Sequence, residues 1–400
     1  MKLRSKLLTV AAVAVAGSAL AVLPMAASNA AEACAPAWTA SQVYVGGNTA
    51  SQSGHNYRAK WWSQNDSPAT HSGQWDVWAD QGVCGGTTPP TDPPTTPPPD
   101  NPPPGGTKMA SAPYLYPGWG SPPTDISGFM RETNIRAFTI AFVLANGCNP
   151  VWDGGGSLTS APHFTTVSAI KAAGGSVVPS IGGWQGNKLG PNCSTPQALA
   201  GAYQKVIDTL GLSAIDIDIE NTDEFENYTV ADRIVDALAI IKRNNPNVKT
   251  ILTFGTTPTG PNAHGIRLIQ QAKAKNANID IFTQMPFDFG VGGGDMYNAT
   301  VGATEGLKNQ LRSTFGWSDQ QAYAHMGISG MNGVSDQSEI TTPQTWTRIR
   351  DYAKGKGLAR FTFWAVNRDR KCTDGSTGAV SHCSSINQEP WEFTKISAGF

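Results

Sequence analysis

The chain has 400 residues, which is more than one hydrophobic core usually organises, so we expect more than one domain. Its 29 Lys and Arg residues nearly balance its 30 Asp and Glu residues, and the formal net charge of −1 argues against a nucleic-acid partner, which would require a basic excess. Only 15% of the residues are charged and 12 are Trp, a composition that favours a flat, neutral, polar ligand such as a polysaccharide unless the tryptophans are buried.

Residues 1–31 have the pattern of a secretory signal peptide. The basic "MKLRSK" precedes the apolar "LLTVAAVAVAGSALAVLPMA", and the small residues of "SNAAEAC" offer a cleavage site near Ala30 or Ala31. An uncleaved membrane anchor is the alternative. No second long apolar run follows, so we expect a secreted, extracellular protein without membrane contact after cleavage.

Six cysteines in a secreted chain favour disulfides over metal ligation. The sequence contains no CxxC or HExxH motif and its histidines are scattered, so we expect neither a metal site nor a cofactor. The positions of the cysteines suggest three local pairs, which are Cys34–Cys84, Cys148–Cys193 and Cys372–Cys383.

Residues 32–85 form the first expected domain, a small β-rich module. Large aromatic side chains, including Trp38 and Trp78, lie between its two cysteines. So small a module has little core and needs a disulfide, so some aromatic rings must be exposed, where they can stack on sugar rings, unless all of them are core. The pattern "W…Y…G…YRAKWW.Q" resembles the chitin-binding modules of carbohydrate-binding families 5 and 12. That resemblance implies ligand contacts by Tyr57, Trp61 and Trp62.

Residues 86–108 are expected to be a linker. The run "GTTPPTDPPTTPPPDNPPPGGT" is too rich in proline to supply helix or ladder donors, so it favours a semi-rigid polyproline II spacer. At about 3.1 Å per residue this spacer would hold its flanks up to roughly 60 Å apart.

Residues 109–400 alternate strand-like apolar runs with amphipathic helical segments such as 195–211 and 229–245. Eight strands with intervening helices predict a (β/α)8 barrel, the TIM barrel of the α/β class. A doubly wound sheet is the alternative, but no GxGxxG follows the first strand. The predicted strands are 113–118, 135–145, 175–183, 214–220, 249–256, 279–287, 324–331 and 359–367.

The strand "AIDIDIE" carries three acids in alternation with isoleucines. Residues at i, i+2 and i+4 share a face, so Asp216, Asp218 and Glu220 should point into the barrel while the isoleucines face the helices. Burial and mutual repulsion should keep one or more protons on these carboxyl groups at neutral pH. Glu220, at the carboxyl end of the strand, is the expected general acid. A partly exposed polar strand face is the alternative.

"SAIDIDIE" resembles the DxxDxDxE motif of glycoside hydrolase family 18, the chitinases. Three further stretches fit the family in order: "SIGG" (180–183), "MPFD" (285–288) and "FWAVNRD" (363–369). The resemblance covers 109–400 and is closest to the bacterial chitinase D-like branch.

The resemblance implies a retaining mechanism in which the 2-acetamido oxygen of the substrate is the nucleophile. Glu220 would then protonate the glycosidic oxygen, Asp218 would orient the acetamido group, and Asp216 would share a proton with Asp218. Trp364 would form the floor of the −1 sugar site, although core packing is the alternative for Trp364 and Met285 considered alone. The further expected substrate-binding residues are Met285, Asp288, Gln284, Trp184 and Tyr114.

The chain departs from the family motifs at two positions. Ser213 replaces the first Asp of DxxDxDxE, where we expect a modest effect, and Phe287 replaces a Tyr whose hydroxyl binds the acetamido carbonyl. Phe289 also lacks a hydroxyl, so Gln284 or Tyr297 is a candidate replacement. This departure predicts low activity or a bias towards transglycosylation.

Two segments beside these motifs are read as loops. The acids of "NTDEFEN" (221–227) are expected on a solvated face, and "GVGGGD" (290–295) is expected to be flexible.

The resemblance as a whole implies a secreted, monomeric chitinase that cleaves β-1,4 bonds between N-acetylglucosamine units and binds chitin and chitooligosaccharides. An endo-β-N-acetylglucosaminidase acting on other glycans is the nearest alternative. A catalytically weak chitin-binding lectin is the alternative from a different class, although such proteins usually lose the final Glu of the motif.

Overall fold

The computed structural model describes residues 32–40, 42–44, 46–60, 63–73, 76–85, 108–290 and 294–400. The expected signal peptide, the linker up to residue 107, Trp61, Trp62 and part of the 290–295 loop lie outside the described residues. The chain divides into two compact units between Pro99 and Asp100. No helix in the described part is both long and apolar enough to cross a membrane.

The N-terminal unit is built from short antiparallel strands. A three-stranded sheet has the order β2 (Thr49–Gln52), β3 (His55–Ala59) and β5 (Trp78–Val83), and β1 (Val43–Tyr44) pairs with β4 (Ser63–Gln64). The hairpin between β2 and β3 turns through Ser53 and Gly54, both with positive φ, as a two-residue primed turn requires. The disulfide Cys34–Cys84 closes the unit.

The ligand contact predicted for Tyr57 is wrong. Tyr57 is only 5% exposed and packs in a small core with Tyr44 and Trp78, whose rings meet edge to face at 4.8 Å. Trp78 is fully buried and donates from Nε1 to the carbonyl oxygen of Asp66 at 2.9 Å. A unit with so few residues needs large rings to form a core, and Tyr57 is one of those rings.

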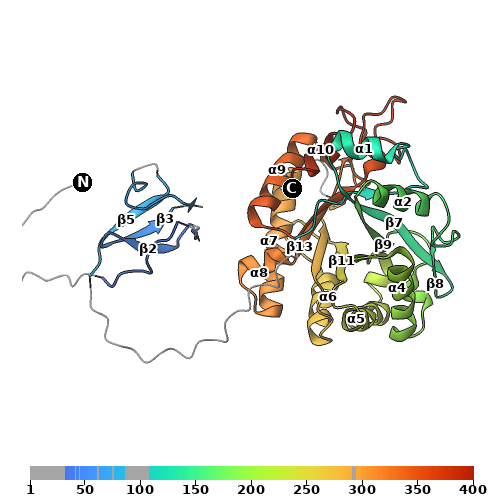
Figure 1. The fold of residues 1–400 in the computed structure, drawn as a ribbon, viewed down its shortest axis with the longest axis horizontal. Helices are drawn as coiled ribbons and strands as arrows, with labels where there is room; N and C mark the ends of the chain where they lie inside the picture. Colours follow the sequence, from blue (N-terminus) through green and yellow to red (C-terminus); the bar gives the residue numbers. More distant parts are fainter. Residues whose placement is uncertain are drawn as a thin grey trace, which may run out of the picture. The chain divides into compact units, whose positions relative to one another are not determined.

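The C-terminal unit is a (β/α)8 barrel, so the predicted fold class is confirmed (Figure 1). Hydrogen bonds from Met109 N to Ala359 O (2.7 Å) and from Ala112 N to Phe361 O (3.2 Å) join the first segment to the last strand. The strand β8 (Asn149–Trp152) adds an antiparallel hairpin to β7. The eight parallel strands are β6 (Tyr114–Leu115), β7 (Ala137–Asn146), β9 (Ser176–Gly182), β10 (Ala214–Asp218), β11 (Lys249–Gly255), β12 (Ile281–Met285), β13 (Met326–Met331) and β16 (Arg360–Trp364).

Helices surround the strands in Figure 1, and their ends follow local sequence signals. In α4 the Thr195 side chain accepts from Ala198 N, Pro196 occupies the first turn, and Gly211 ends the helix in the left-handed region. Thr342, Pro343 and Gly357 bound α9 in the same way. The helices are α1 (Ile126–Thr133), α2 (His163–Ala172), α3 (Leu189–Asn192), α4 (Pro196–Leu210), α5 (Tyr228–Asn244), α6 (Ala263–Ala274), α7 (Met296–Phe315), α8 (Asp319–Ala324), α9 (Pro343–Lys356) and α10 (Glu392–Ser397).

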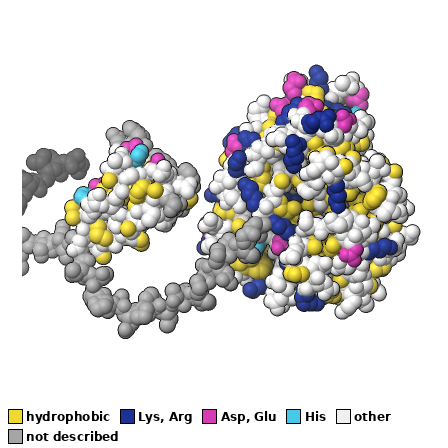
Figure 2. Space-filling view, in the orientation of Figure 1, with side chains coloured by type: hydrophobic (Ala, Val, Ile, Leu, Met, Phe, Trp, Pro, Cys, Tyr) yellow, Lys and Arg dark blue, Asp and Glu magenta, His cyan; other side chains and the backbone are white. Residues whose placement is uncertain are grey.

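Two further disulfides tie down segments of the barrel unit. Cys148–Cys193 joins the β7–β8 turn to the end of α3, and Cys372–Cys383 closes a loop that follows β16. All six cysteines are therefore paired as their positions suggested. On the face shown in Figure 2, Lys and Arg side chains are dispersed among neutral ones and form no single basic patch.

Candidate active site

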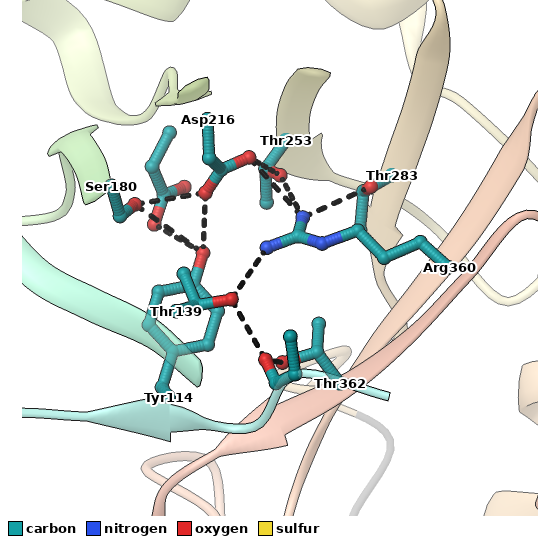
Figure 3. Close-up of polar contacts among 10 residues, drawn as sticks. Tyr114, Thr139, Ser180, Asp216, Thr253, Thr283, Arg360 and Thr362 are labelled. Atoms are coloured by element: carbon teal, nitrogen blue, oxygen red, sulfur yellow. Dashed lines mark hydrogen bonds and ion pairs between the residues drawn. The ribbon is translucent and has the colours of Figure 1, made fainter. Parts of the chain in front are cut away.

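The strand β10 sends its two aspartates into the barrel and its isoleucines into the helical layer. Ile215 and Ile217 belong to the main hydrophobic core, whereas Asp216 and Asp218 are buried. Figure 3 shows Asp216 among the polar groups inside the barrel. Parallel pairing with β9 sets Asp216 opposite Ser180 and Asp218 opposite Gly182. The alternation of the sequence therefore produces the expected inward row of acids.

Asp216 is fully buried and is surrounded by hydrogen-bond donors from four other strands. Its oxygens accept from the hydroxyls of Tyr114 (2.9 Å), Ser180 (2.9 Å) and Thr253 (2.6 Å). The guanidinium of Arg360 completes the set at 3.2 Å. A buried acidic group is tolerated when it is paired and hydrogen-bonded in this way.

Arg360 is the main residue of this network that the sequence reading missed. It lies on β16, is fully buried, and also donates to Thr139 (3.0 Å), Thr253 (3.0 Å) and Thr283 (3.1 Å). Its signal in the sequence is a cation inside the apolar run "ARFTFW", where a buried position needs an opposite charge. Arg360 supplies that charge to the acids of β10 from a strand that lies 144 residues away in the chain.

Asp218 differs from Asp216 in having few partners. Its Oδ2 accepts from the Tyr114 hydroxyl at 3.3 Å, and its buried Oδ1 has no hydrogen-bond partner among the described residues. Burial, with the nearby charges of Glu220 and Asp216, raises the pKa of Asp218 well above its usual range. The protonated form of Asp218 is therefore favoured more strongly than that of a free aspartate.

Tyr114 connects the two aspartates, and this changes two expectations. The described residues show no direct hydrogen bond between Asp216 and Asp218. The Tyr114 hydroxyl contacts Asp216 (Figure 3) and also lies 3.3 Å from Asp218 Oδ2. Tyr114 is 2% exposed, so its hydroxyl is occupied inside the barrel and does not form the predicted sugar contact. Tyr114 is a positioning residue for the acids.

Glu220 follows the end of β10 and is partly exposed. The N–H of Ile219 still pairs with Thr253 O at 2.8 Å, and Asn221 then turns the chain with a φ of 69°. Burial raises the pKa of Glu220 to about 7, and the charges of Asp288 and Asp336 act in the same direction while Lys188 acts against them. A carboxyl group with this pKa at the carboxyl end of a barrel strand is suited to donate a proton near neutral pH.

Trp364 lies at the end of β16 on the same face of the strand as Arg360 and Thr362. Its ring stacks on Phe142 at 5.5 Å, meets Tyr114 edge to face at 5.6 Å and tilts against Trp119 at 5.1 Å. Trp364 is half-buried, so one part of the indole is held by this aromatic cluster and another part is accessible. Phe142 and Trp119 were not predicted, because only their neighbours in space distinguish them from other aromatic residues.

The other expected substrate-binding residues are placed differently from one another. Trp184 is 60% exposed and follows the "SIGG" segment, where a free indole face can stack on a sugar. Met285 shares the inward face of β12 with Thr283 and is 7% exposed. Asp288 is exposed, has a φ of 55°, and accepts from Gln337 N at 3.0 Å.

Gln284 does not face the site, which corrects that prediction. It alternates with Thr283 and Met285, so it points to the helices, where it is fully buried and its amide bonds to Thr304 of α7. Tyr297 packs against the main core, with the Arg348 guanidinium 3.9 Å from its ring centre. Neither residue therefore replaces the hydroxyl that Phe287 lacks.

The segment after Glu220 was expected to be a solvated loop, and this expectation is wrong for Glu224. Residues Asn221–Phe225 form a π-helical turn, η1, and Glu224 is 3% exposed. Burial raises the pKa of Glu224 to about 8. Asp223 bonds to the ammonium of Lys188 at 3.0 Å. Because the turn has only five residues, its sequence shows no periodic pattern from which its buried side could be predicted.

The described residues contain one group of His, Cys, Asp or Glu side chains close enough together to hold a metal ion. It comprises Cys372, Asp374 and Cys383, and both cysteines are joined in a disulfide. No thiolate is available there, so this group does not fit a metal.

Comparison with known proteins places this barrel beside chitinases, although no protein-family model matches the chain. The probable bifunctional chitinase/lysozyme of Escherichia coli is 27% identical over 324 residues, which are 73% of this chain and 34% of that protein. Endochitinase 11 of Metarhizium anisopliae is 26% identical over 287 residues, 66% of this chain and 53% of its own length. The chain thus spans about a third and about half of these two relatives.

A solved structure supports the same class. The catalytic domain of the hyperthermophilic chitinase from Pyrococcus furiosus matches with a TM-score of 0.66 and 26% identity, over 73% of this chain and 94% of that one. These similarities support a glycoside hydrolase. The barrel unit is therefore similar to the catalytic domains of chitinases.

Proposed function

We propose that this chain is a chitinase that hydrolyses β-1,4 bonds between N-acetylglucosamine units with retention of configuration. The observation that carries the proposal is the pair formed by Glu220 and Asp218. Glu220 is partly exposed, with a pKa raised by burial to about 7, and follows by two residues the buried Asp218, whose pKa burial also raises. In this pair, Glu220 is an acid whose pKa lies near neutral pH, and Asp218 is the group that can orient the substrate.

In the proposed first step, Glu220 gives its proton to the glycosidic oxygen as the bond to the anomeric carbon breaks. The acetamido oxygen of the same sugar attacks that carbon and forms an oxazolinium ion. Asp218 orients the acetamido group, and its unpartnered Oδ1 is available to accept from the acetamido N–H. Glu220, now a carboxylate, then removes a proton from the water that opens the ring, which restores the acid.

The residues around this pair support binding of a neutral sugar chain. Trp364 offers an accessible indole, which stacks on Phe142. Met285 lies at the end of β12, and Asp288 lies in the segment after it. Trp184 offers an exposed ring. Aromatic side chains offer large apolar faces, on which the apolar faces of pyranose rings can stack. We therefore infer that chitooligosaccharides bind across the carboxyl ends of the strands.

We also propose that the chain is secreted as a monomer and that residues 32–85 bind insoluble chitin. The signal-like pattern of 1–31 and the proline-rich spacer of 86–108 support this organisation. With Tyr57 in the core, Trp61 and Trp62 remain the candidate contacts. Deletion of 32–85 should lower binding to insoluble chitin and leave turnover of soluble oligomers unchanged; an equal loss on both would contradict the module's role.

The catalytic proposal is tested with the wild-type protein, Glu220→Gln and a matched control, Glu226→Gln, which removes an exposed acid at the end of η1. Each is incubated with chitohexaose, and NMR follows the first anomer formed. We expect initial β-anomer from the wild type and the control, and none from Glu220→Gln.

Three outcomes would contradict the proposal. Initial α-anomer would exclude retention. Binding of chitohexaose without turnover by any of the three proteins would indicate a lectin. Turnover of glycoprotein glycans but not of chitohexaose would indicate an endo-β-N-acetylglucosaminidase.

A further inference from the structure

Lys188 is a buried lysine whose ammonium bonds to the segment that carries Glu220. Its side chain is 1% exposed, and Nζ donates to the backbone carbonyl of Glu220 at 3.2 Å and to Asp223 Oδ1 at 3.0 Å. Lysine is almost never fully buried unless it is paired, so these contacts account for its place. They tie the chain just before α3 to the turn that follows β10.

The same two segments are joined at other points. Asn221, the residue after Glu220, has a φ of 69° and donates from Nδ2 to the carbonyl of Trp184 at 3.2 Å. Gly183 N donates to Asp218 O at 2.9 Å. At Gly190 an added Cβ would lie 2.5 Å from Glu224 Oε1, so the main chain approaches η1 closely there. π-Helical turns such as η1 occur often at functional sites.

The titratable groups that influence Glu220 come from several elements. Asp218 lies on β10, and Glu224 lies on η1 beside Asp223. Asp288 follows β12, and Asp336 lies between β14 (Gly333–Val334) and β15 (Ile340–Thr341). Lys188 opposes the acids among them, because its positive charge lowers the pKa of Glu220 and of Glu224.

The charge of Lys188 is not cancelled by its buried neighbour. The pKa of Glu224 is about 8, so this carboxyl is mostly protonated at neutral pH. Asp223 is the ion-pair partner, and its side chain is 41% exposed and shared with solvent. The positive charge of Lys188 still acts on Glu220, whose pKa it lowers.

We propose that Lys188 is a positioning residue for Glu220: its ammonium holds the Glu220 main chain at the end of β10 and places a fixed positive charge beside the carboxyl group. This inference rests on the proposed function and deepens it. The charge favours the carboxylate that Glu220 becomes after it has given its proton to the leaving group. Lys188 thus limits how strongly Glu220 holds that proton in a site otherwise surrounded by acids.

The test compares Lys188→Met, Lys188→Gln and Lys188→Arg with the wild type, using kcat/KM for chitohexaose from pH 4 to 10. Lys308→Met is the matched control, because Lys308 is also buried and ion-paired, with Glu305 at 3.2 Å and Asp319 at 3.4 Å, on the outer helices α7 and α8. Thermal unfolding by circular dichroism confirms that each variant is folded. Lys188→Gln retains a donor without a charge and serves if Lys188→Met does not fold.

We expect the alkaline limb of the profile to move up by about one pH unit in the neutral variants, because an opposite charge has been removed from the acid. We expect kcat at pH 6 to fall about tenfold in them as the acid loses its anchor. In Lys188→Arg, kcat/KM should fall at the same alkaline pH as in the wild type. Lys308→Met should lower the unfolding temperature without changing the pH at which kcat/KM falls.

A folded neutral variant with an unshifted limb would overturn the role of Lys188 while leaving the chitinase proposal intact. A limb that moves in Lys188→Arg as far as in the neutral variants would also overturn it. A wild-type protein that does not cleave chitohexaose would remove both proposals together, and this result is read before any variant is compared.

Discussion

Replacement of Arg360 by Met should show what holds the barrel interior together. Met fills much of the same volume but leaves Asp216 buried without its cation, and Thr139, Thr253 and Thr283 each lose a guanidinium donor. Removal of one partner from a buried ion pair costs about 3–5 kcal/mol, because the remaining charge is uncompensated. We expect Arg360→Met to lower the free energy of unfolding by about this amount at pH 7.

Urea unfolding followed by tryptophan fluorescence measures this loss, with Asp216→Asn and the double variant completing a double-mutant cycle. The double variant should be more stable than the sum of the single losses predicts, since it no longer buries an unpaired charge. An unpaired buried carboxylate is relieved by protonation, so the folded variant binds a proton more readily than the unfolded chain, and its stability should rise as the pH falls. The difference in free energy of unfolding between Arg360→Met and the wild type should therefore become smaller from pH 7 to pH 5.

This reasoning would be refuted if Arg360→Met lowered the free energy of unfolding by less than about 1 kcal/mol. It would also be refuted if the difference in free energy of unfolding from the wild type did not change with pH. The first result would mean that the three hydroxyl donors to Asp216 suffice without the cation. The second would mean that the cost of the variant is a packing defect.

Three further predictions concern the site. Because the general acid must hold a proton and the pKa of Glu220 is about 7, kcat/KM on soluble chitooligosaccharide should fall above about pH 7, and a limb near pH 4.3 would contradict this assignment. Tyr114→Phe removes the hydroxyl shared by Asp216 and Asp218 and should lower kcat about 10- to 100-fold with little change in KM; a change confined to KM would indicate that Tyr114 binds sugar instead. Trp184→Ala should raise KM for long chitooligosaccharides about tenfold and change the free energy of unfolding by less than about 0.5 kcal/mol, since the ring is 60% exposed; an unchanged KM would exclude Trp184 from the sugar site.

Alternation along strands made part of the site predictable. Asp216 and Asp218 face inward because every second residue of a strand shares a face, and the isoleucines between them confirm the buried outer side. The same rule shows why Gln284 was misplaced: Met285 and Gln284 are adjacent on β12 and cannot both face the barrel interior. Strict use of the rule would have removed Gln284 before the structure was known.

Burial of isolated residues was harder to predict. Tyr57 and Glu224 carry side chains that are usually at least partly accessible, yet both are covered by elements distant in the chain or by a turn too short to show a period. Their burial depends on how many other side chains each unit can pack around them to form a core. Local sequence carries little information about that quantity.

The sequence by itself determined the order of strands and helices, the inward row of acids and the three local cysteine pairs, because each depends on spacings of a few residues or on neighbours along the chain. Only the tertiary structure decided which groups surround those acids. Arg360, Tyr114 and Lys188 come from other strands and loops, and barrel closure brings them to Asp216, Asp218 and Glu220. Proton affinities depend on such through-space neighbours and on burial, and therefore the acid strength of Glu220 follows from the closed barrel.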